Sequence, residues 1–224
     1  MERYMKMLGM TFAAVLSLQL LCMGAASAEV IKAGQDAPAF TGTDSNGNKH
    51  SLSEYRGKYV VLEWHGYHCP WTLKYYGSGA MQALQREWTA KGVVWLSILS
   101  DRPGSESYRT AESENIYLKK MNAAPTAALL DPDGTIGHLY NAQSTLHMIV
   151  VSPEGKILYN GAIDDHPTND PADIPKSRNY VSEALTESMA GKQVAVSTTH
   201  PYGCWIRYKD GGAGSALPLV APNG

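Results

Sequence analysis

The sequence predicts one α/β domain: a central mixed sheet with a parallel core, an antiparallel hairpin, and helices on both faces. Apolar runs at residues 59–64 and 93–99 are separated by a helical pattern, and a helical crossover of this kind joins parallel strands. Later runs at 147–151 and 157–161 are separated only by the turn Pro153-Glu154-Gly155, which is typical of an antiparallel hairpin.

The first elements are short. Residues 30–50 predict an irregular or hairpin lead-in with a turn at 44–48, where Asp, Ser, Asn and Gly gather. Ser51 and Glu54 form the pattern of a capping box, which predicts a short helix that ends by Arg56.

The later helices follow from spacing and from helix-ending residues. Pro70 is tolerated in a first helical turn, apolar residues repeat at helical spacing further on, and Gly92 ends this helix. A second helix is predicted near 111–121, a short strand at 126–130, and a last helix at about 175–189.

The N-terminus predicts export. Basic residues precede an apolar run at 7–23, and the small residues Ala26-Ser27-Ala28 follow, so residues 1–28 have the layout of a secretory signal peptide. The expected location is periplasmic or secreted. Residues 29–208 are then the folded domain, and 209–224 are expected to be a flexible tail.

Two other interpretations of the N-terminus are open. A membrane anchor is disfavoured because the strongly apolar stretch, 8–21, is shorter than the ~20 residues that a span needs. Lipidation at Cys22 is disfavoured because residues 19–21 lack the small residue expected directly ahead of a lipidated cysteine.

Composition excludes some classes of function. The chain is 44% hydrophobic and 18% charged with a net charge of −2, so nothing favours nucleic-acid binding. After signal cleavage only Cys69 and Cys204 remain, too few for a disulfide scaffold, in a compartment that permits oxidation.

Cys69 is the main candidate for chemistry. It lies where an apolar strand leads through a loop to a helix that begins at Pro70. Unpaired N–H groups and the partial positive charge of a helix N-terminus favour a thiolate, which is the reactive form. His68 and His65 flank this position and are candidates to tune it. The alternative is a buried, inert cysteine that fills space.

The stretch VVLEWHGYHCPWT at 60–72 resembles the active-site segment of the thioredoxin superfamily. With the lead-in hairpin and the YNGAID ending at 159–164, the chain most resembles redoxin-domain proteins of the AhpC/TSA type over residues 33–208. Some relatives carry a single Cys-Pro and a C-terminal Pro-Tyr-Gly-Cys, found here at 201–204. The resemblance implies a thioredoxin-like fold and thiol–disulfide exchange or slow thiol peroxidase (antioxidant) chemistry.

Three departures from the family pattern limit this implication. Thr72 replaces the second cysteine of Cys-x-x-Cys, although its hydroxyl is able to hydrogen-bond a thiolate. Gly66 stands where peroxidase members carry a threonine or serine. Leu146 stands where the family has a cis-proline, and its bond is expected to be trans because a non-proline cis bond costs about 2.5–4 kcal/mol.

Glu63 interrupts an otherwise apolar strand, where a carboxylate is costly unless it is partnered or protonated. The resemblance implies that it matches the buried aspartate of thioredoxins, a general acid/base with a raised pKa. The alternative is a carboxylate that faces water or pairs with a lysine.

Cys204 offers a second thiol, 135 residues after Cys69. It could resolve an oxidised Cys69, form a permanent disulfide with it that adds roughly 4–5 kcal/mol of stability, or be an unrelated thiol. Geometry decides among these, because the two Cα atoms must approach within roughly 7 Å.

Two functions follow as expectations. The first is an exported thiol oxidoreductase without a cofactor, with Cys69, Glu63, Thr72, His68 and Cys204 at its site and a thiol, disulfide or peroxide as partner. The second is a non-catalytic module that binds a protein partner, or copper or zinc through His65, His68 and Cys69, with His147 and Met148 facing them.

Overall fold

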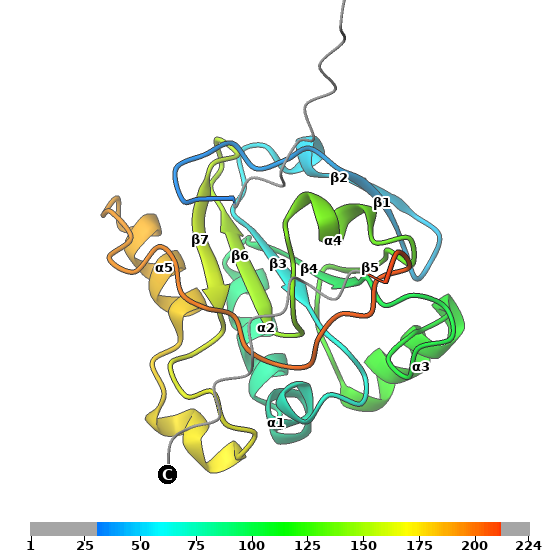
Figure 1. The fold of residues 1–224 in the computed structure, drawn as a ribbon. Coiled ribbons are helices and arrows are strands. Elements are labelled where there is room, and N and C mark those ends of the chain that lie inside the picture. The colour runs from blue at the N-terminus through cyan, green and yellow to red at the C-terminus, as the bar shows by residue number, and fades with distance from the viewer. Residues whose placement is uncertain (1–30, 212–224) are drawn as a thin grey trace, which may run out of the picture.

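A seven-stranded mixed sheet organises residues 31–211, the part of the chain that the computed structural model describes (Figure 1). The strands lie in the order β2-β1-β5-β4-β3-β6-β7. They are β1 Thr41–Asp44, β2 Lys49–Ser51, β3 Val60–Trp64, β4 Val94–Leu99, β5 Ala127–Leu130, β6 His147–Val151 and β7 Ile157–Ala162. β3, β4 and β5 are parallel, whereas β6 and β7 form an antiparallel hairpin, so the predicted sheet is confirmed.

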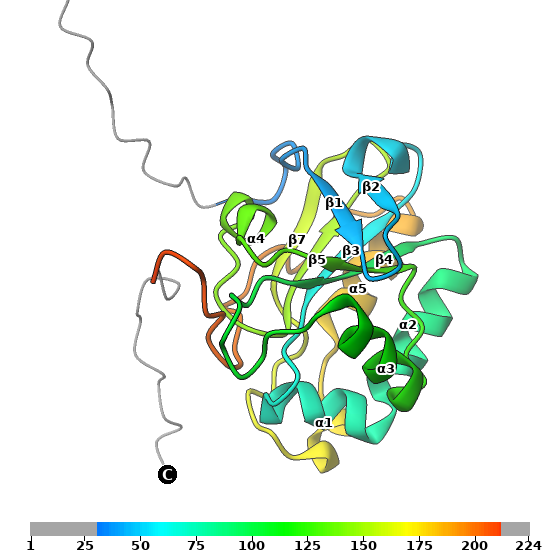
Figure 2. The ribbon, with the colours of Figure 1, turned by 90° about the vertical axis from the view of Figure 1, so that its right-hand side faces the viewer.

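Helices cover both faces of this sheet. They are α1 Pro70–Ser78, α2 Ala80–Ala90, α3 Ala111–Met121, α4 Thr135–Leu139 and α5 Tyr180–Met189, with 3-10 helices η1 Leu52–Tyr55 and η2 Pro171–Lys176. Buried side chains of α1, α2, α3 and α5 share one apolar cluster, and Ile136 of α4 belongs to the cluster on the opposite face. Figure 2 shows α4 and α2 on opposite sides of the strands.

Local signals located most of the elements. The capping box at Ser51 is present, with both of its hydrogen bonds. The helix predicted to run from Pro70 to Gly92 is instead two helices, because Gly79 adopts a left-handed conformation (φ 83°) that ends α1 and begins α2. The five-residue α4 is too short to produce a periodic pattern and was not predicted.

The last helix begins later than predicted, at Tyr180, where Asn179 caps it through a hydrogen bond to the N–H of Ser182. Pro175 lies in η2 instead.

β3 is buried on both faces. Val60, Leu62 and Trp64 join the cluster beneath α4, while Val61 joins the cluster beneath α1, α2 and α5. Glu63 lies on the same face of the strand as Val61, and it is paired with Met148 of β6. A carboxylate is therefore placed in the middle of the core.

The end of the described chain forms an extended segment, residues 197–208, which we call the C-terminal strap. It runs from β7, past the start of α1, toward α4 and β5 (Figure 1). The Thr145 N–H donates to the Cys204 carbonyl at 2.9 Å, and the Ile206 N–H donates to the Gln143 carbonyl at 3.0 Å.

The predicted signal peptide at 1–28 lies outside the described residues, as does most of the predicted tail, 212–224. No helix within 31–211 combines the length and apolar character that a membrane crossing requires.

Candidate functional site

Cys69 lies between the end of β3 and the start of α1. It is the N-cap residue of α1, as predicted, and Pro70 occupies the first helical position. Cys69 is only 1% exposed, so its sulfur is buried. Burial alone would disfavour a thiolate, and the polar neighbours decide its state.

Hydrogen-bond donors surround the Cys69 sulfur. The Thr145 hydroxyl donates at 2.8 Å and the Cys204 N–H donates at 3.3 Å. The Cys204 thiol and the Thr72 N–H also donate to it. The hydrogen bond from the Cys204 thiol makes the largest contribution to the pKa of Cys69 and lowers it. Burial raises this pKa, but the donors outweigh burial, and the pKa is about 5.

Cys204 is the partner in this contact. Its pKa is raised because it donates its proton to the Cys69 sulfur, because it is partly buried, and because the Cys69 charge is close. Both cysteines are free thiols. The contact excludes the interpretation that the two thiols are unrelated, and the pair holds one proton between them at neutral pH.

Gly66 explains how Thr145 reaches the sulfur. A Cβ atom at position 66 would lie 2.7 Å from the Thr145 methyl carbon, closer than real side chains approach. Position 66 has no hydroxyl, and the hydroxyl that reaches the Cys69 sulfur comes instead from Thr145, in the loop before β6. Sequence reasoning missed Thr145, although it singled out the next residue, Leu146.

Leu146 follows Thr145 in a trans peptide bond, as predicted, since residues 31–211 contain no cis bond. Its φ is +60°, an uncommon conformation for a branched side chain. Its N–H donates to the carbonyl of Trp64 at 2.6 Å, and its side chain is fully buried. These contacts hold the loop that carries Thr145 against the end of β3.

Glu63 is fully buried and accepts hydrogen bonds from four neutral donors. They are Tyr76 Oη at 2.9 Å, Gln85 Nε2 at 3.2 Å, Trp95 Nε1 at 2.6 Å and Ser97 Oγ at 3.1 Å. The alternative of a water-facing or lysine-paired carboxylate is therefore wrong. Within residues 31–211, the groups that bind the Cys69 sulfur belong to Thr145, Cys204 and Thr72, and Glu63 is not one of them.

Comparison with protein families places the chain in a known family. A family model described as "AhpC/TSA family" matches residues 33–160, more than half of the chain. The chain belongs to the AhpC/TSA family.

Solved structures share the fold of this AhpC/TSA chain. A hypothetical protein from Sinorhizobium meliloti is 20% identical with a TM-score of 0.69, and the match covers 81% of this chain and 97% of that one. An uncharacterized conserved protein from Geobacillus kaustophilus is also 20% identical, with a TM-score of 0.70 and coverage of 82% and 96%. A putative thiol:disulfide interchange protein DsbE from Chlorobium tepidum is 20% identical, with a TM-score of 0.50 and coverage of 72% and 97%. At these identities the similarity shows a thioredoxin-like fold. No curated protein sequence matches the chain.

The side chains of two other predicted site residues, Thr72 and His68, do not bind the sulfur. Thr72 is fully buried but donates through its backbone, and its hydroxyl has no hydrogen-bond partner within 31–211. His68 is exposed, and its ring packs edge-on against Tyr67, with ring centres 4.4 Å apart. Neither side chain therefore tunes the sulfur by direct contact.

The copper or zinc site suggested for this AhpC/TSA chain is not assembled. His65 is buried with its Nε2 3.3 Å from Glu114 Oε1. Burial lowers the pKa of His65, but Glu114, and then Glu63 and Asp101, raise it more. His147 is hydrogen-bonded to Asn160 at 2.6 Å. Within 31–211 no three His, Cys, Asp or Glu side chains gather in a way that could hold a metal.

Asp101 is a further residue that the sequence did not indicate. It follows β4, is 4% exposed and accepts the N–H of Arg207 in the strap at 3.0 Å. Burial raises its pKa, the Arg207 N–H and nearby positive charges lower it, and the negative charge of Cys69 adds to the rise. Its charge also raises the pKa of Cys204, so this carboxylate is electrostatically coupled to both thiols.

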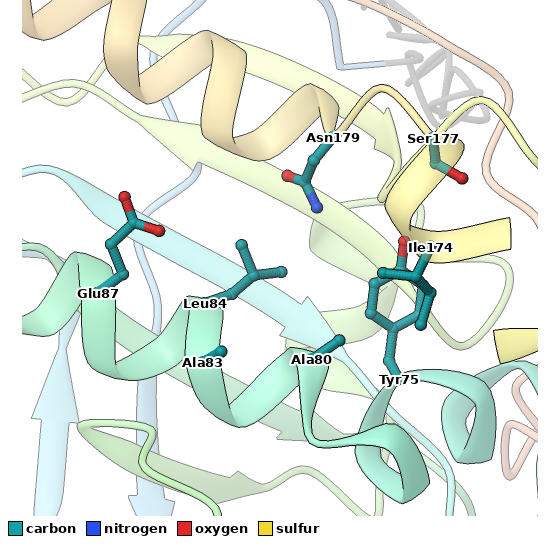
Figure 3. A pocket seen from close by; sticks show the side chains of 8 residues that line it. All are labelled: Tyr75, Ala80, Ala83, Leu84, Glu87, Ile174, Ser177 and Asn179. Carbon is teal, nitrogen blue, oxygen red and sulfur yellow. The ribbon is translucent and has the colours of Figure 1, made fainter. Parts of the chain in front are cut away.

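A surface pocket of about 240 Å³ lies elsewhere, between α2, η2 and the start of α5 (Figure 3). Mostly apolar groups line it, among them Tyr75, Ala80, Leu84 and Ile174. None of the residues that bring the two sulfurs together lines this pocket.

Proposed function

We propose that this chain is a thiol–disulfide oxidoreductase in which Cys69 is the nucleophile and Cys204 is the second thiol. The observation that carries the proposal is the closeness of the two cysteines: the Cys204 N–H donates to the Cys69 sulfur at 3.3 Å, the pKa of Cys69 is lowered to about 5, and that of Cys204 is raised. A thiolate is the attacking species in thiol–disulfide exchange. Membership of the AhpC/TSA family supports the same class of chemistry.

The reaction proceeds in two exchanges. The Cys69 thiolate attacks one sulfur of a substrate disulfide, whose S–S bond breaks, and the other substrate sulfur leaves as a thiolate that takes up a proton. Cys204 then attacks the Cys69 sulfur of this mixed disulfide, and its proton passes to the departing substrate thiolate. The substrate ends as a dithiol and the protein as a Cys69–Cys204 disulfide.

The coupling between the thiols supports this order. While Cys69 is a thiolate, its charge and its hydrogen bond keep Cys204 protonated. Once Cys69 is bonded to the substrate, that charge is gone and Cys204 loses its proton more readily. Thr145 and the Thr72 N–H stabilise the Cys69 thiolate before the attack.

A small peroxide is a second candidate substrate, and the burial of Cys69 favours it because a small molecule needs little access. The thiolate attacks one peroxide oxygen, the O–O bond breaks and the alkoxide leaves with a proton. The resulting sulfenic acid condenses with the Cys204 thiol and releases water, which gives the same disulfide.

The test is the reaction of the reduced protein with glutathione disulfide and, separately, with hydrogen peroxide. We expect wild-type protein to form an intramolecular disulfide with no retained glutathione, detected by mass spectrometry under non-reducing conditions. The faster oxidant at equal concentration identifies the preferred substrate class.

Matched single-cysteine variants assign the roles. Cys204→Ser should stop at a Cys69–glutathione adduct, whereas Cys69→Ser should react far more slowly at pH 7, because burial and the Asp101 charge still raise the pKa of Cys204. Retention of glutathione on both cysteines of the wild-type protein would contradict the proposed pairing.

We also propose that the chain is exported. The basic residues, apolar run and small-residue site within 1–28 support this, and an oxidising compartment suits a pair that cycles through a disulfide. Expression in a bacterial host followed by N-terminal sequencing should find a mature chain that begins at Glu29. A full-length chain in the cytosolic fraction would contradict it.

A further inference from the structure

A buried carboxylate, Asp164, lies just after β7 at the centre of a polar cluster. Its Oδ2 accepts the Lys74 ammonium at 3.2 Å and also the Tyr75 hydroxyl. Its Oδ1 accepts the His166 N–H at 2.9 Å and also the Tyr202 hydroxyl. The side chains of Lys74 and Asp164 are both fully inaccessible, so these bonds are not weakened by competition with water.

This cluster joins the two segments that carry the cysteines. Lys74 and Tyr75 belong to α1, which begins directly after Cys69. Tyr202 belongs to the C-terminal strap, two residues before Cys204. One carboxylate therefore binds both the helix that carries the nucleophile and the strap that carries the second thiol.

The strap residues that follow Tyr202 are also packed closely against the loop that carries Thr145. Gly203 has φ +136°, and a Cβ atom there would lie 2.2 Å from the Thr145 carbonyl oxygen. The Cys204 N–H then reaches Thr145 Oγ1 at 3.2 Å and the Cys69 sulfur at 3.3 Å. The backbone from 202 to 204 thus has little freedom once Tyr202 is bound.

We propose that Tyr202 and Asp164 are positioning residues whose hydrogen bond holds the Cys204 thiol against Cys69. This inference rests on the proposed function, in which Cys204 attacks a mixed disulfide at Cys69. A thiol that is held in place makes this attack at a high effective concentration. Neither residue contacts the Cys69 sulfur, so both act through the strap.

The test compares Tyr202→Phe with Tyr75→Phe. Each variant removes one phenol hydroxyl from the same carboxylate and keeps the aromatic ring, but only Tyr202 lies on the strap. The first measurement is hydrogen–deuterium exchange of the strap amides of reduced protein. We expect exchange at Cys204 and Ile206 to become about tenfold faster in Tyr202→Phe and to stay unchanged in Tyr75→Phe.

The second measurement is the equilibrium between the dithiol and the Cys69–Cys204 disulfide in glutathione buffers. We expect Tyr202→Phe to lower the equilibrium constant for disulfide formation about tenfold, because a loosened strap in the dithiol form lowers the effective concentration of Cys204 at Cys69. Tyr75→Phe should leave it unchanged.

The outcomes separate this inference from the proposed function. Unchanged strap exchange in Tyr202→Phe, or equal loosening in both variants, would overturn the positioning role. If wild-type protein forms no disulfide while the exchange pattern is as expected, the proposed function fails and the positioning of the strap stands.

Discussion

At the scale of single residues, the absence of a side chain at position 66 determines what surrounds the Cys69 sulfur. Gly66 leaves the space that the Thr145 methyl carbon occupies, and the Thr145 hydroxyl then donates to the sulfur at 2.8 Å. A hydrogen bond to an anion is stronger than one between neutral groups. The part of the lowered Cys69 pKa that comes from Thr145 therefore depends on Gly66 as well.

Gly66→Ala is expected to raise the pKa of Cys69 by about 1–2 pH units, because it displaces Thr145 and removes a hydrogen bond to a charged group. The measurement is the pH dependence of iodoacetamide alkylation at Cys69. Thr145→Val should raise the midpoint similarly, and Thr145→Ser should preserve it.

The matched control is Gly77→Ala in α1, where an added Cβ meets no atom within 4 Å. It should leave the alkylation midpoint in place and stabilise the helix slightly. An unchanged midpoint in Gly66→Ala would show that the hydrogen bond from Thr145 to the Cys69 sulfur does not depend on a glycine at position 66.

At the scale of secondary-structure elements, Glu63 joins the central strand to its neighbours. Its carboxylate accepts hydrogen bonds from α1 (Tyr76), from α2 (Gln85) and from two side chains of β4. An ionised carboxylate has acceptor sites for all four donors. The charge in the core is thereby compensated by dipoles from the three elements that follow β3 in the chain.

Glu63→Gln is expected to lower the free energy of unfolding by about 2–4 kcal/mol, because the new amide nitrogen is a donor that faces other donors. Urea denaturation measures this loss. Glu87→Gln, on the exposed face of α2, removes only a surface ion pair and should change stability by less than about 0.5 kcal/mol.

The same variant tests the acid/base role that the family resemblance implies for Glu63. Since Glu63 does not donate to or accept from the sulfur, we expect the alkylation midpoint of Cys69 to stay in place in Glu63→Gln. A large shift of that midpoint without loss of stability would support the proton-carrier role instead.

At the scale of the whole molecule, the ionisation of Cys69 couples folding to pH. Its pKa is about 5 in the folded protein and about 8.5 in an unfolded chain. Below pH 5 both states hold the proton and the thiol contributes nothing. Between these values the unfolded state binds more protons, so the contribution of Cys69 to stability rises with pH and is lost as pH falls toward 5.

We therefore expect the stability difference between reduced wild-type protein and Cys69→Ser to grow from pH 5.5 to pH 8. Above about pH 8.5 the unfolded chain also loses the Cys204 proton while the folded chain keeps it, so the difference should stop growing and then decrease. Urea denaturation across this range measures it. A difference that is independent of pH would contradict a Cys69 thiolate in the folded protein.

Local sequence patterns were sufficient for most of the fold. Alternation of apolar runs with helical spacing predicted the sheet, and the capping box at Ser51 predicted η1. The break at Gly79 and the short α4 were missed, because a glycine can end a helix or lie inside one and five residues show no periodicity.

For the site, the sequence by itself determined that Cys69 begins a helix after a buried strand, since that placement depends only on neighbouring residues. Tertiary structure decided what touches the sulfur. Thr145 and Cys204 arrive from segments 76 and 135 residues away, and Asp101 and Asp164 take part through the strap. Side chains so distant in sequence leave no periodic or capping signal, because only the packing of the folded chain brings them together.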